Sequence, residues 1–237
     1  MPQRIPFRPD ASDLPLAKPP DRIPTGSLAT VRRKAKQCRD CPLWMHATQT
    51  VFGEGPADAQ VMLIGEQPGA QEDLQGAPFV GPAGRILDKA LTQAGLSREA
   101  VYLTNTVKHF KFQPRGKARL HKRANAAEQE ACRPWLAAEL ARVRPQVVVA
   151  LGAMAAQTLF GNAFGLMRER GQWRRLGTDT QALATWHPSA ILRMRPPQRE
   201  AARTQLVADL ARAATGLTPH PEGTHRRGRR FQDGRVE

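Results

Sequence analysis

The amino-acid sequence predicts an α/β domain in which a mostly parallel sheet is covered by helices on both faces. Short apolar runs of strand length alternate with segments of helical periodicity along most of the chain, and this alternation is typical of parallel sheets with helical crossovers. The chain has 237 residues, which is enough for one domain of this class with some residues left over as tails.

Four strands are expected where the short apolar runs lie. The first run, QVMLIG at 60–65, closes at a glycine and has the continuous apolar character of a strand buried on both faces. The other strands are expected at 101–104, 146–151 and 183–185. Ligands of parallel sheets bind outside the carboxyl ends of the strands, so these ends are the first places to search for a site.

The helices are expected between the strands. Residues 83–94 place their apolar side chains on one stripe before Gly95, as in an amphipathic helix that ends at glycine. Asn125 and Glu128 form a capping-box pattern that begins a helix. Pro134 is expected to kink or restart that helix before it ends near Arg142. The remaining helices are expected at 153–160 and 198–214.

The net charge points to a polyanionic partner. Lys and Arg total 36 against 21 Asp and Glu, which gives +15, and nucleic acid is the polyanion that such proteins most often bind. The proline-rich residues 1–26 are expected to be a flexible arm, 27–215 the domain, and 216–237 a flexible basic tail. Residues 108–123 hold seven basic residues and no acidic one; a solvated surface loop is the plain interpretation, and a functional loop is favoured because of its neighbours.

The compartment follows from what the sequence lacks. No apolar run has the length of a membrane span and the N-terminus has no signal-peptide pattern. Three cysteines, an odd number, argue against a disulfide framework and for a reducing compartment. A cytoplasmic protein without membrane contact, and a monomer, is therefore expected.

Three polar side chains follow the ends of predicted strands. Glu66 follows the first strand, Asn105 the second and His187 the fourth. The loop between Gly65 and Gly84 is rich in glycine and proline, which suits backbone held close to a ligand. Each signal is weak alone, because a single histidine is more often structural than catalytic, but together they indicate a pocket at this edge of the sheet.

The cysteines indicate a metal site. Cys38 and Cys41 have the two-residue spacing of a metal-binding pair, and Cys132 is the only other cysteine. A fourth ligand must then be another residue type, and His109, just after the second strand, is the best placed. Zinc sites use histidine more often than iron–sulfur sites do, so the residues alone leave zinc and an iron–sulfur cluster both open.

At this point several motifs resemble those of iron–sulfur uracil-DNA glycosylases. They are GEQPG at 65–69, PFVG at 78–81, Asn105, ACRP at 131–134 and HPS at 187–189. A more specific resemblance is to the UdgX subgroup, through Gln67, KHFKF at 108–112 and the basic insertion GKARLHK at 116–122, in which Ala118 and Leu120 depart from the subgroup pattern. The resemblance covers about residues 38–214 and implies a three-layer α/β/α sandwich with a four-stranded parallel sheet.

The resemblance also implies roles for individual residues. A [4Fe–4S] cluster with a structural role would be held by Cys38, Cys41, His109 and Cys132. In the pocket that begins at Gly65, Phe79 would stack on a flipped uracil, Asn105 would hydrogen-bond its pairing edge, and Gln67 would shape the pocket or control water access. His187 would stabilise the uracil anion, and Glu66 would face the sugar, where a carboxylate stabilises developing positive charge.

His121 carries the sharpest expectation from the resemblance. Its imidazole would attack C1′ and leave a covalent protein–DNA adduct at the abasic site, while Lys117, Arg119, Lys122 and Arg123 would contact phosphates. The expected substrate is uracil-containing DNA, preferably single-stranded, in the cytoplasm of a bacterium. The alternatives are a conventional glycosylase with multiple turnovers and, in another class, a non-catalytic nucleic-acid-binding metalloprotein.

Overall fold

The computed structural model describes residues 14–116 and 118–217, and its centre is a five-stranded sheet in the order β2-β1-β5-β7-β6. The first four strands of this order are parallel to one another, and β6 pairs antiparallel with β7. The strands are β1 (Val61–Gly65), β2 (Val101–Asn105), β5 (Val147–Leu151), β6 (Arg174–Leu176) and β7 (Thr180–Thr185).

The four predicted strands are confirmed, but the expected four-stranded sheet is wrong because β6 adds an edge strand. β6 is three residues long and two of them are arginines. A strand that short and polar gives no apolar run, so the sequence pattern does not reveal it.

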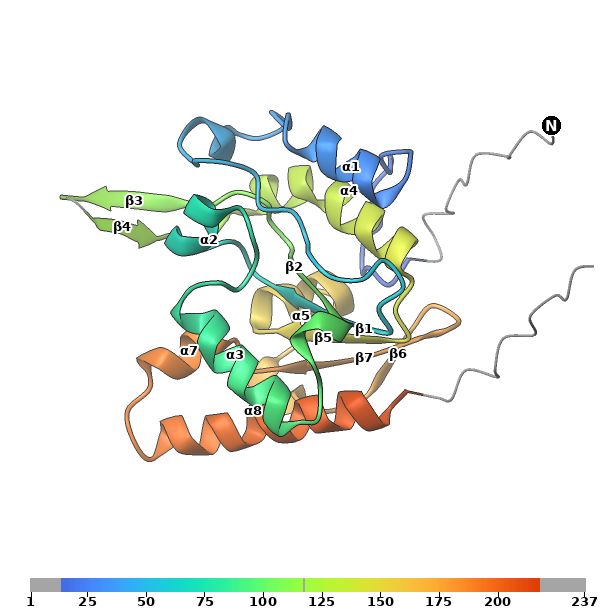
Figure 1. Cartoon of the computed structure of the whole chain (residues 1–237), viewed down its shortest axis with the longest axis vertical. Helices are drawn as coiled ribbons and strands as arrows, with labels where there is room; N and C mark the ends of the chain where they lie inside the picture. The colour runs from blue at the N-terminus through green and yellow to red at the C-terminus, as the bar shows by residue number, and fades with distance from the viewer. Residues whose placement is uncertain (1–13, 117, 218–237) are drawn as a thin grey trace, which may run out of the picture.

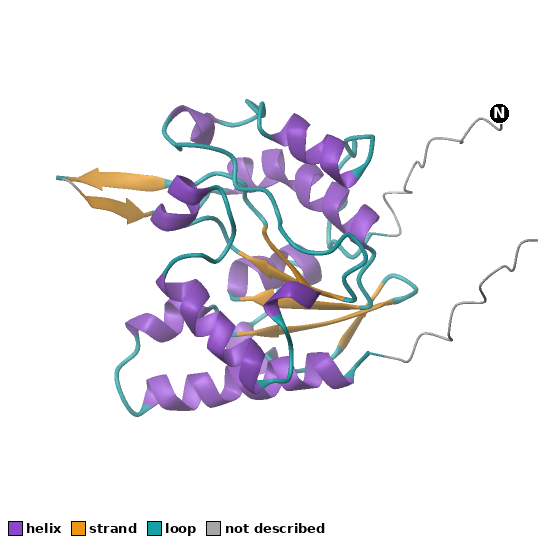
Figure 2. Ribbon diagram, in the orientation of Figure 1, coloured by secondary structure: helices purple, strands orange, loops and turns teal. Residues whose placement is uncertain are grey.

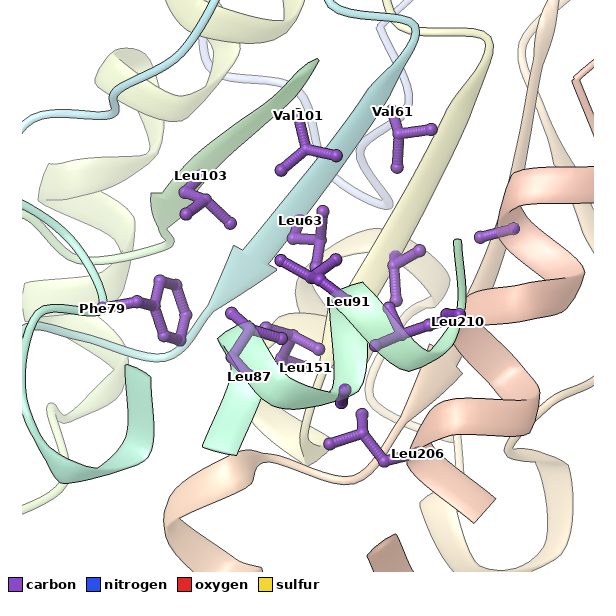
Figure 3. Packing of buried hydrophobic residues seen from close by; sticks show 14 of the residues in the cluster. Val61, Leu63, Phe79, Leu87, Leu91, Val101, Leu103, Leu151, Leu206 and Leu210 are labelled. Carbon is purple, nitrogen blue, oxygen red and sulfur yellow. The ribbon is translucent and has the colours of Figure 1, made fainter. Parts of the chain in front are cut away.

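One face of the sheet is covered by α3 (Pro82–Gln93), α7 (Pro188–Arg193) and α8 (Gln198–Thr215) (Figure 1). Their apolar side chains pack on the odd-numbered residues of the central strands, such as Leu63 and Leu151 (Figure 3). Leu87 and Leu91 of α3 are completely buried there, and full burial of such a side chain is worth about 1.5–3 kcal/mol.

The opposite face is covered by α4 (Ala126–Val143) and α5 (Ala153–Phe160), and α1 (Leu28–Ala35) packs outside α4 (Figure 2). The even-numbered strand residues, such as Met62 and Val148, pack against this layer. Helices therefore lie on both faces of the sheet, as predicted.

Helix α4 begins with the predicted capping box. Asn125 Oδ1 accepts a hydrogen bond from the amide of Glu128 at 2.9 Å, and Glu128 Oε2 accepts one from the amide of Asn125 at 2.7 Å. The helix then continues to Val143 with Pro134 inside it, so of the two outcomes expected at Pro134, a kink or a restart, the restart is wrong. Packing of the helix against β2 and α1 outweighs the hydrogen bond that proline removes.

Residues 108–123 are not simply a loop. They contain a two-stranded antiparallel hairpin, β3 (Phe112–Arg115) and β4 (Ala118–His121), in which Phe112 pairs with His121. Figure 1 shows the hairpin projecting from the domain beside α2 (Ala70–Gln75). Two further short helices, α6 (Leu166–Glu169) and the 3-10 helix Pro42–Met45, lie in connections, as does a 3-10 turn at Arg98–Ala100.

The expected N-terminal arm is partly wrong, because residues 14–26 lie against the domain. Leu16 is buried in the core and the amide of Ala17 donates to the carbonyl of Thr158 at 3.1 Å. Arg142 holds the carbonyls of Pro24 and Gly26 at 2.6 and 2.7 Å. Residues 1–13 and 218–237, which make up the rest of the predicted arm and nearly all of the predicted tail, lie outside the described residues.

None of the helices in the described part of the chain combines the length and apolar character needed to cross a membrane.

Candidate active site

Asn105 and Phe79 meet over Gly65 at the carboxyl edge of the sheet. Gly65 and Asn105 are register partners at the ends of β1 and β2. A Cβ atom on residue 65 would clash with Asn105 Oδ1 and would lie 2.6 Å from Phe79 Cζ, so only glycine allows the two side chains this approach. Asn105 is 3% exposed and its Oδ1 has no hydrogen-bond partner in the described structure. A buried unpaired acceptor is costly, and it marks a place for a donor from a ligand.

The backbone at Phe79 is strained. Its φ is 56°, in the left-handed region that bulky residues rarely adopt. Helix α3 begins just after it, and a Cβ on Gly84 would clash with the carbonyl of Phe79. The close packing of Gly84 thus holds the strained turn that places the Phe79 ring beside Asn105, and strain of this kind is often found at functional sites.

His187 lies at the end of β7 as the N-cap of α7. Its Nδ1 accepts a hydrogen bond from the amide of Ser189 at 3.1 Å, so the proton of the neutral ring is assigned to Nε2. Burial, followed by the nearby charges of His121 and Arg193, lowers the pKa of His187 to about 4. The ring centroid is 6.1 Å from that of Phe79. His187 is therefore a neutral hydrogen-bond donor beside the pocket at neutral pH.

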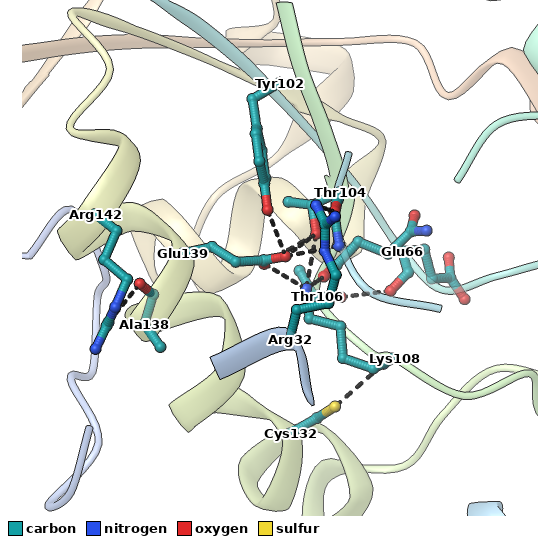
Figure 4. Close-up of polar contacts among 12 residues, drawn as sticks. Arg32, Glu66, Tyr102, Thr104, Thr106, Lys108, Cys132, Ala138, Glu139 and Arg142 are labelled. Atoms are coloured by element: carbon teal, nitrogen blue, oxygen red, sulfur yellow. Dashed lines mark hydrogen bonds and ion pairs between the residues drawn. The ribbon is translucent and has the colours of Figure 1, made fainter. Parts of the chain in front are cut away.

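Glu66 is held by its backbone. Its carbonyl accepts hydrogen bonds from Thr106 Oγ1 at 2.6 Å and from the amide of Val107 at 3.0 Å, and Figure 4 shows its carboxylate directed away from these contacts. Among the described residues, no side chain or amide donates to that carboxylate. The charge of Glu66 raises the pKa of His121, which places the two side chains close together.

His121 returns to the same edge at the end of the hairpin. Desolvation by neighbouring atoms lowers the pKa of His121; Glu66 opposes this effect, and the charge of Arg193 adds to it. The residue is exposed, so its ring is accessible to a large ligand. Arg193 was not among the predicted site residues. It is the last residue of α7, the short helix for which His187 is the N-cap.

Gln67 and Arg119 attach the hairpin to the domain. Gln67 Nε2 donates to the carbonyls of Lys111 and Lys122, at 3.1 and 3.2 Å. Arg119 pairs with the buried carboxylate of Asp73 at 2.6 Å and donates to the carbonyl of Ala70 at 3.1 Å. Both side chains therefore make internal contacts where the sequence analysis expected a pocket role for Gln67 and a phosphate contact for Arg119.

The other expected phosphate-binding residues are less constrained. Lys122 and Arg123 are exposed, and Arg123 makes one long contact of 3.4 Å with Gln157 Oε1. Lys117 lies outside the described residues.

The predicted metal ligands gather between α1, α4 and the segment after β2. Cys38 and Cys132 belong to one buried cluster, against which Cys41 packs. Trp135 Nε1 donates to Cys38 Sγ at 3.2 Å and the amide of Lys108 donates to Cys132 Sγ at 3.1 Å. Such N–H···S bonds are typical of the sulfur ligands of iron–sulfur clusters. Burial raises the pKa of Cys132 to about 12, so a thiolate here requires a compensating cation.

His109 completes the donor set. It is 3% exposed, its Nε2 lies 2.9 Å from Thr50 Oγ1, and its buried Nδ1 has no partner in the described structure. An imidazole oriented through one nitrogen with the other free has the arrangement of a metal ligand. No three His, Cys, Asp or Glu side chains in the described residues converge as they would on a single ion.

An ion pair that the sequence pattern does not reveal contacts the backbone of Asn105. Lys108, which was counted in the basic run, is buried against Glu139 of α4, with 2.6 Å between Nζ and Oε2. One signal could have found it: Glu139 lies between Leu136 and Leu140 on an otherwise apolar helix face, and a carboxylate there needs a buried partner.

Comparisons with family models and with individual proteins point to the same family. Residues 52–211 match the model of the uracil DNA glycosylase superfamily. A type-4 uracil-DNA glycosylase of Archaeoglobus fulgidus is 38% identical over 182 residues, which cover 73% of this chain and 87% of that protein. A type-4 uracil-DNA glycosylase of Thermotoga maritima is 37% identical over 169 residues, 70% of this chain and 83% of that protein. One from Pyrobaculum aerophilum is 35% identical over 184 residues, 74% and 87% respectively.

Proposed function

The chain belongs to the uracil-DNA glycosylase superfamily, and from this premise we propose that it excises uracil from DNA by cleaving the bond between the base and C1′. The observation that carries the proposal is the buried, unpaired Oδ1 of Asn105 beside the ring of Phe79. The names of the relatives support a conventional enzyme with multiple turnovers better than the covalent adduct expected from the sequence.

The pocket suits recognition of a flipped base. The N3–H of uracil would donate to Asn105 Oδ1, and its O4 would accept from the amide nitrogen of the same side chain. The Phe79 ring provides a stacking surface. Because the base must leave the helix to reach this buried position, single-stranded DNA is the preferred substrate in this proposal.

Two groups act on the charges that develop as the bond breaks. The departing uracil gains negative charge, and the neutral Nε2–H of His187 donates a hydrogen bond to it. The sugar gains positive charge, and the Glu66 carboxylate stabilises it and orients the water that attacks C1′. The depressed pKa of His187 is consistent with a donor that is neutral throughout the reaction.

The test uses a labelled single-stranded oligonucleotide with one uracil, and the same oligonucleotide with thymine. We expect alkali-cleavable abasic DNA from the uracil substrate only, in amounts beyond the enzyme concentration. The Asn105→Ala variant should lose most of this activity. Absence of base release by the wild-type protein would exclude a glycosylase and favour a non-catalytic DNA-binding protein.

A second candidate is covalent capture by His121, the UdgX-type reaction. The specific observation that favours it is the position of His121: its ring interacts electrostatically with both Glu66 and His187. Its lowered pKa keeps a nitrogen lone pair available at neutral pH. A ring nitrogen would bond to C1′ as uracil departs with the electron pair of the broken bond, and the other ring nitrogen would then lose its proton to Glu66 or water.

A denaturing gel separates the two candidates. Capture predicts a protein–DNA band that survives heat and detergent, that requires uracil and that disappears in the His121→Ala variant. A conventional enzyme predicts free abasic product and no such band. Base release by the His121→Ala variant is expected in either case, because the pocket is intact.

We also propose that Cys38, Cys41, His109 and Cys132 hold a [4Fe–4S] cluster. The unpaired His109 Nδ1 and the N–H···S bonds to Cys38 and Cys132 support it. When bound, the cluster would join the α1 region, the segment after β2 and α4 into one unit. Iron and sulfide analysis tests the proposal: a brown protein with both elements is expected, and a colourless zinc protein would contradict it.

A further inference from the structure

Lys108 is buried immediately behind the uracil-reading asparagine. Its side chain is 1% exposed and that of Glu139 is 0% exposed. Figure 4 shows the two side chains meeting between β2 and α4, with Tyr102 and Thr104 around them. A buried lysine needs hydrogen-bond acceptors to compensate for lost hydration. The acceptors of Lys108 therefore identify the groups whose positions it fixes.

The ammonium group has three acceptors within 2.7 Å. Lys108 Nζ donates to Glu139 Oε2 at 2.6 Å, to Thr104 Oγ1 at 2.7 Å and to the backbone carbonyl of Asn105 at 2.6 Å. An ammonium group has three protons, and each has one of these acceptors. One of the three thus holds the backbone of Asn105 directly.

Glu139 is fixed equally well. Its Oε1 accepts hydrogen bonds from the amide of Gly53 at 2.8 Å, from the Tyr102 hydroxyl at 3.2 Å and from Thr104 at 3.1 Å. Since Glu139 belongs to α4 and Tyr102 to β2, the ion pair joins the helix layer to the end of the strand. The lysine therefore has a rigid support on the side away from Asn105.

The side chain of Asn105 has no such support. Its Oδ1 has no partner in the described residues, and Gly65 beneath it has no side chain to hold it. No hydrogen bond to Oδ1 from the described residues therefore fixes its direction. The place of the side chain depends on its packing beside Phe79 and on its backbone, which Lys108 holds through the Asn105 carbonyl.

We propose that Lys108, supported by Glu139, is a positioning residue that fixes Asn105 for uracil recognition; this rests on the proposed glycosylase function. The alternative role is stability alone. Two apolar side chains of similar volume could serve that role as well as a buried ion pair, but they could not donate to the carbonyl of Asn105. The discriminating property is recognition of the base in a protein that is still folded.

The test compares four variants with the wild type. Lys108→Met with Glu139→Gln removes both charges together and avoids leaving a buried carboxylate unpaired. Lys108→Arg keeps the charge, but its planar fork cannot direct three protons at these three acceptors. Asn105→Ala shows how much uracil binding and release are lost when the side chain proposed to bind uracil is removed. Lys89→Met is the matched control, because Lys89 is exposed on α3.

Three quantities are measured on each protein. They are the single-turnover rate of uracil release, the inhibition constant of free uracil, and the dissociation constant for a uracil-free oligonucleotide. Urea unfolding and the visible absorbance of the cluster show whether the fold and the metal centre are intact.

We expect the double variant and Lys108→Arg to raise the inhibition constant of uracil and to slow its release by about tenfold or more, approaching Asn105→Ala. Binding of uracil-free DNA and the Lys89→Met control should stay at wild-type values. If a folded variant of either kind binds and releases uracil as the wild type does, the positioning role is wrong and the glycosylase function stands. If the wild type and Lys89→Met neither bind nor release uracil, the proposed function fails and this inference fails with it.

Discussion

Two regions meet at the carboxyl edge of the sheet, and they are held there in different ways. The proposed base pocket (Gly65, Glu66, Phe79, Asn105 and His187) consists of strand ends and the turn before α3, and all five residues are buried or half-buried. The hairpin (residues 112–121) projects from the domain and is mostly exposed (Figure 1). The pocket is part of the core, whereas the hairpin is attached to it by a few polar side chains.

This difference separates two chemical tasks. Groups that stabilise a transition state must be preorganised, and the strand ends, together with the buried Lys108–Glu139 pair, provide this from within the core. A nucleophile delivered by a tethered hairpin can be altered without changing the core. Base release should therefore depend on the pocket and the core residues that hold it, and any capture of the sugar should depend on the hairpin as well.

The largest effect is expected in the pocket. Replacing His187 by alanine removes the neutral donor assigned to the negative charge that develops on the departing base, and loss of such a donor typically costs about 10²–10³ in rate. We expect the single-turnover rate of uracil release to fall by this amount. His46→Ala is the control, because His46 is exposed in a connection. A loss under about tenfold would show that another group stabilises the anion.

The pH dependence of the same step tests the protonation state of His187. Burial lowers the pKa of His187 to about 4, so the ring is neutral from about pH 6 upward and the rate should not fall between about pH 6 and 8 on its account. If the imidazolium were the active form, the rate would fall about tenfold for each pH unit above that pKa. Single-turnover rates in buffers of constant ionic strength distinguish the two.

The same contrast explains how much the sequence could predict. The strand ends that carry Glu66, Asn105 and His187 follow apolar runs, and parallel strands bring such ends to one edge; the pocket was therefore predictable. The hairpin was not, because β3 and β4 are only four residues long each and β3 contains Pro114, which argues against a strand. The burial of Lys108 was not predicted for a related reason. A lysine within a basic run is expected at the surface, and its burial depends on Glu139, which is far from it in the sequence.

A smaller effect is expected from loosening the hairpin. Arg119→Ala leaves the buried Asp73 carboxylate without its cation, which typically costs about 1–3 kcal/mol. We expect the free energy of unfolding to fall by about this amount in urea titrations, while uracil release changes by less than about threefold, equivalent to under 1 kcal/mol. Any covalent band should weaken more than base release does.

Arg115→Ala is the matched control for that experiment, since Arg115 is exposed at the end of β3. It should leave both stability and base release near wild type. A loss of base release in Arg119→Ala as large as in His187→Ala would contradict the separation of the two regions.

The smallest effect is expected from the exposed cations beside the hairpin. Lys122 is exposed, and a phosphate contact by its ammonium group would release about one counterion from single-stranded DNA. Lys122→Ala should therefore weaken DNA binding and reduce the slope of log K against log salt concentration by about 0.7. Binding titrations at several salt concentrations measure this slope.

Arg119 gives the opposite expectation in the same titration, although it lies only three positions before Lys122 in the chain. Its guanidinium already pairs with Asp73 and the carbonyl of Ala70, so Arg119→Ala should lower stability and leave the salt slope unchanged. An unchanged slope in Lys122→Ala together with a reduced slope in Arg119→Ala would mean that Arg119 leaves Asp73 when DNA binds. The hairpin would then rearrange on binding, and the contacts of Arg119 with Asp73 and Ala70 would be present only in the protein without DNA.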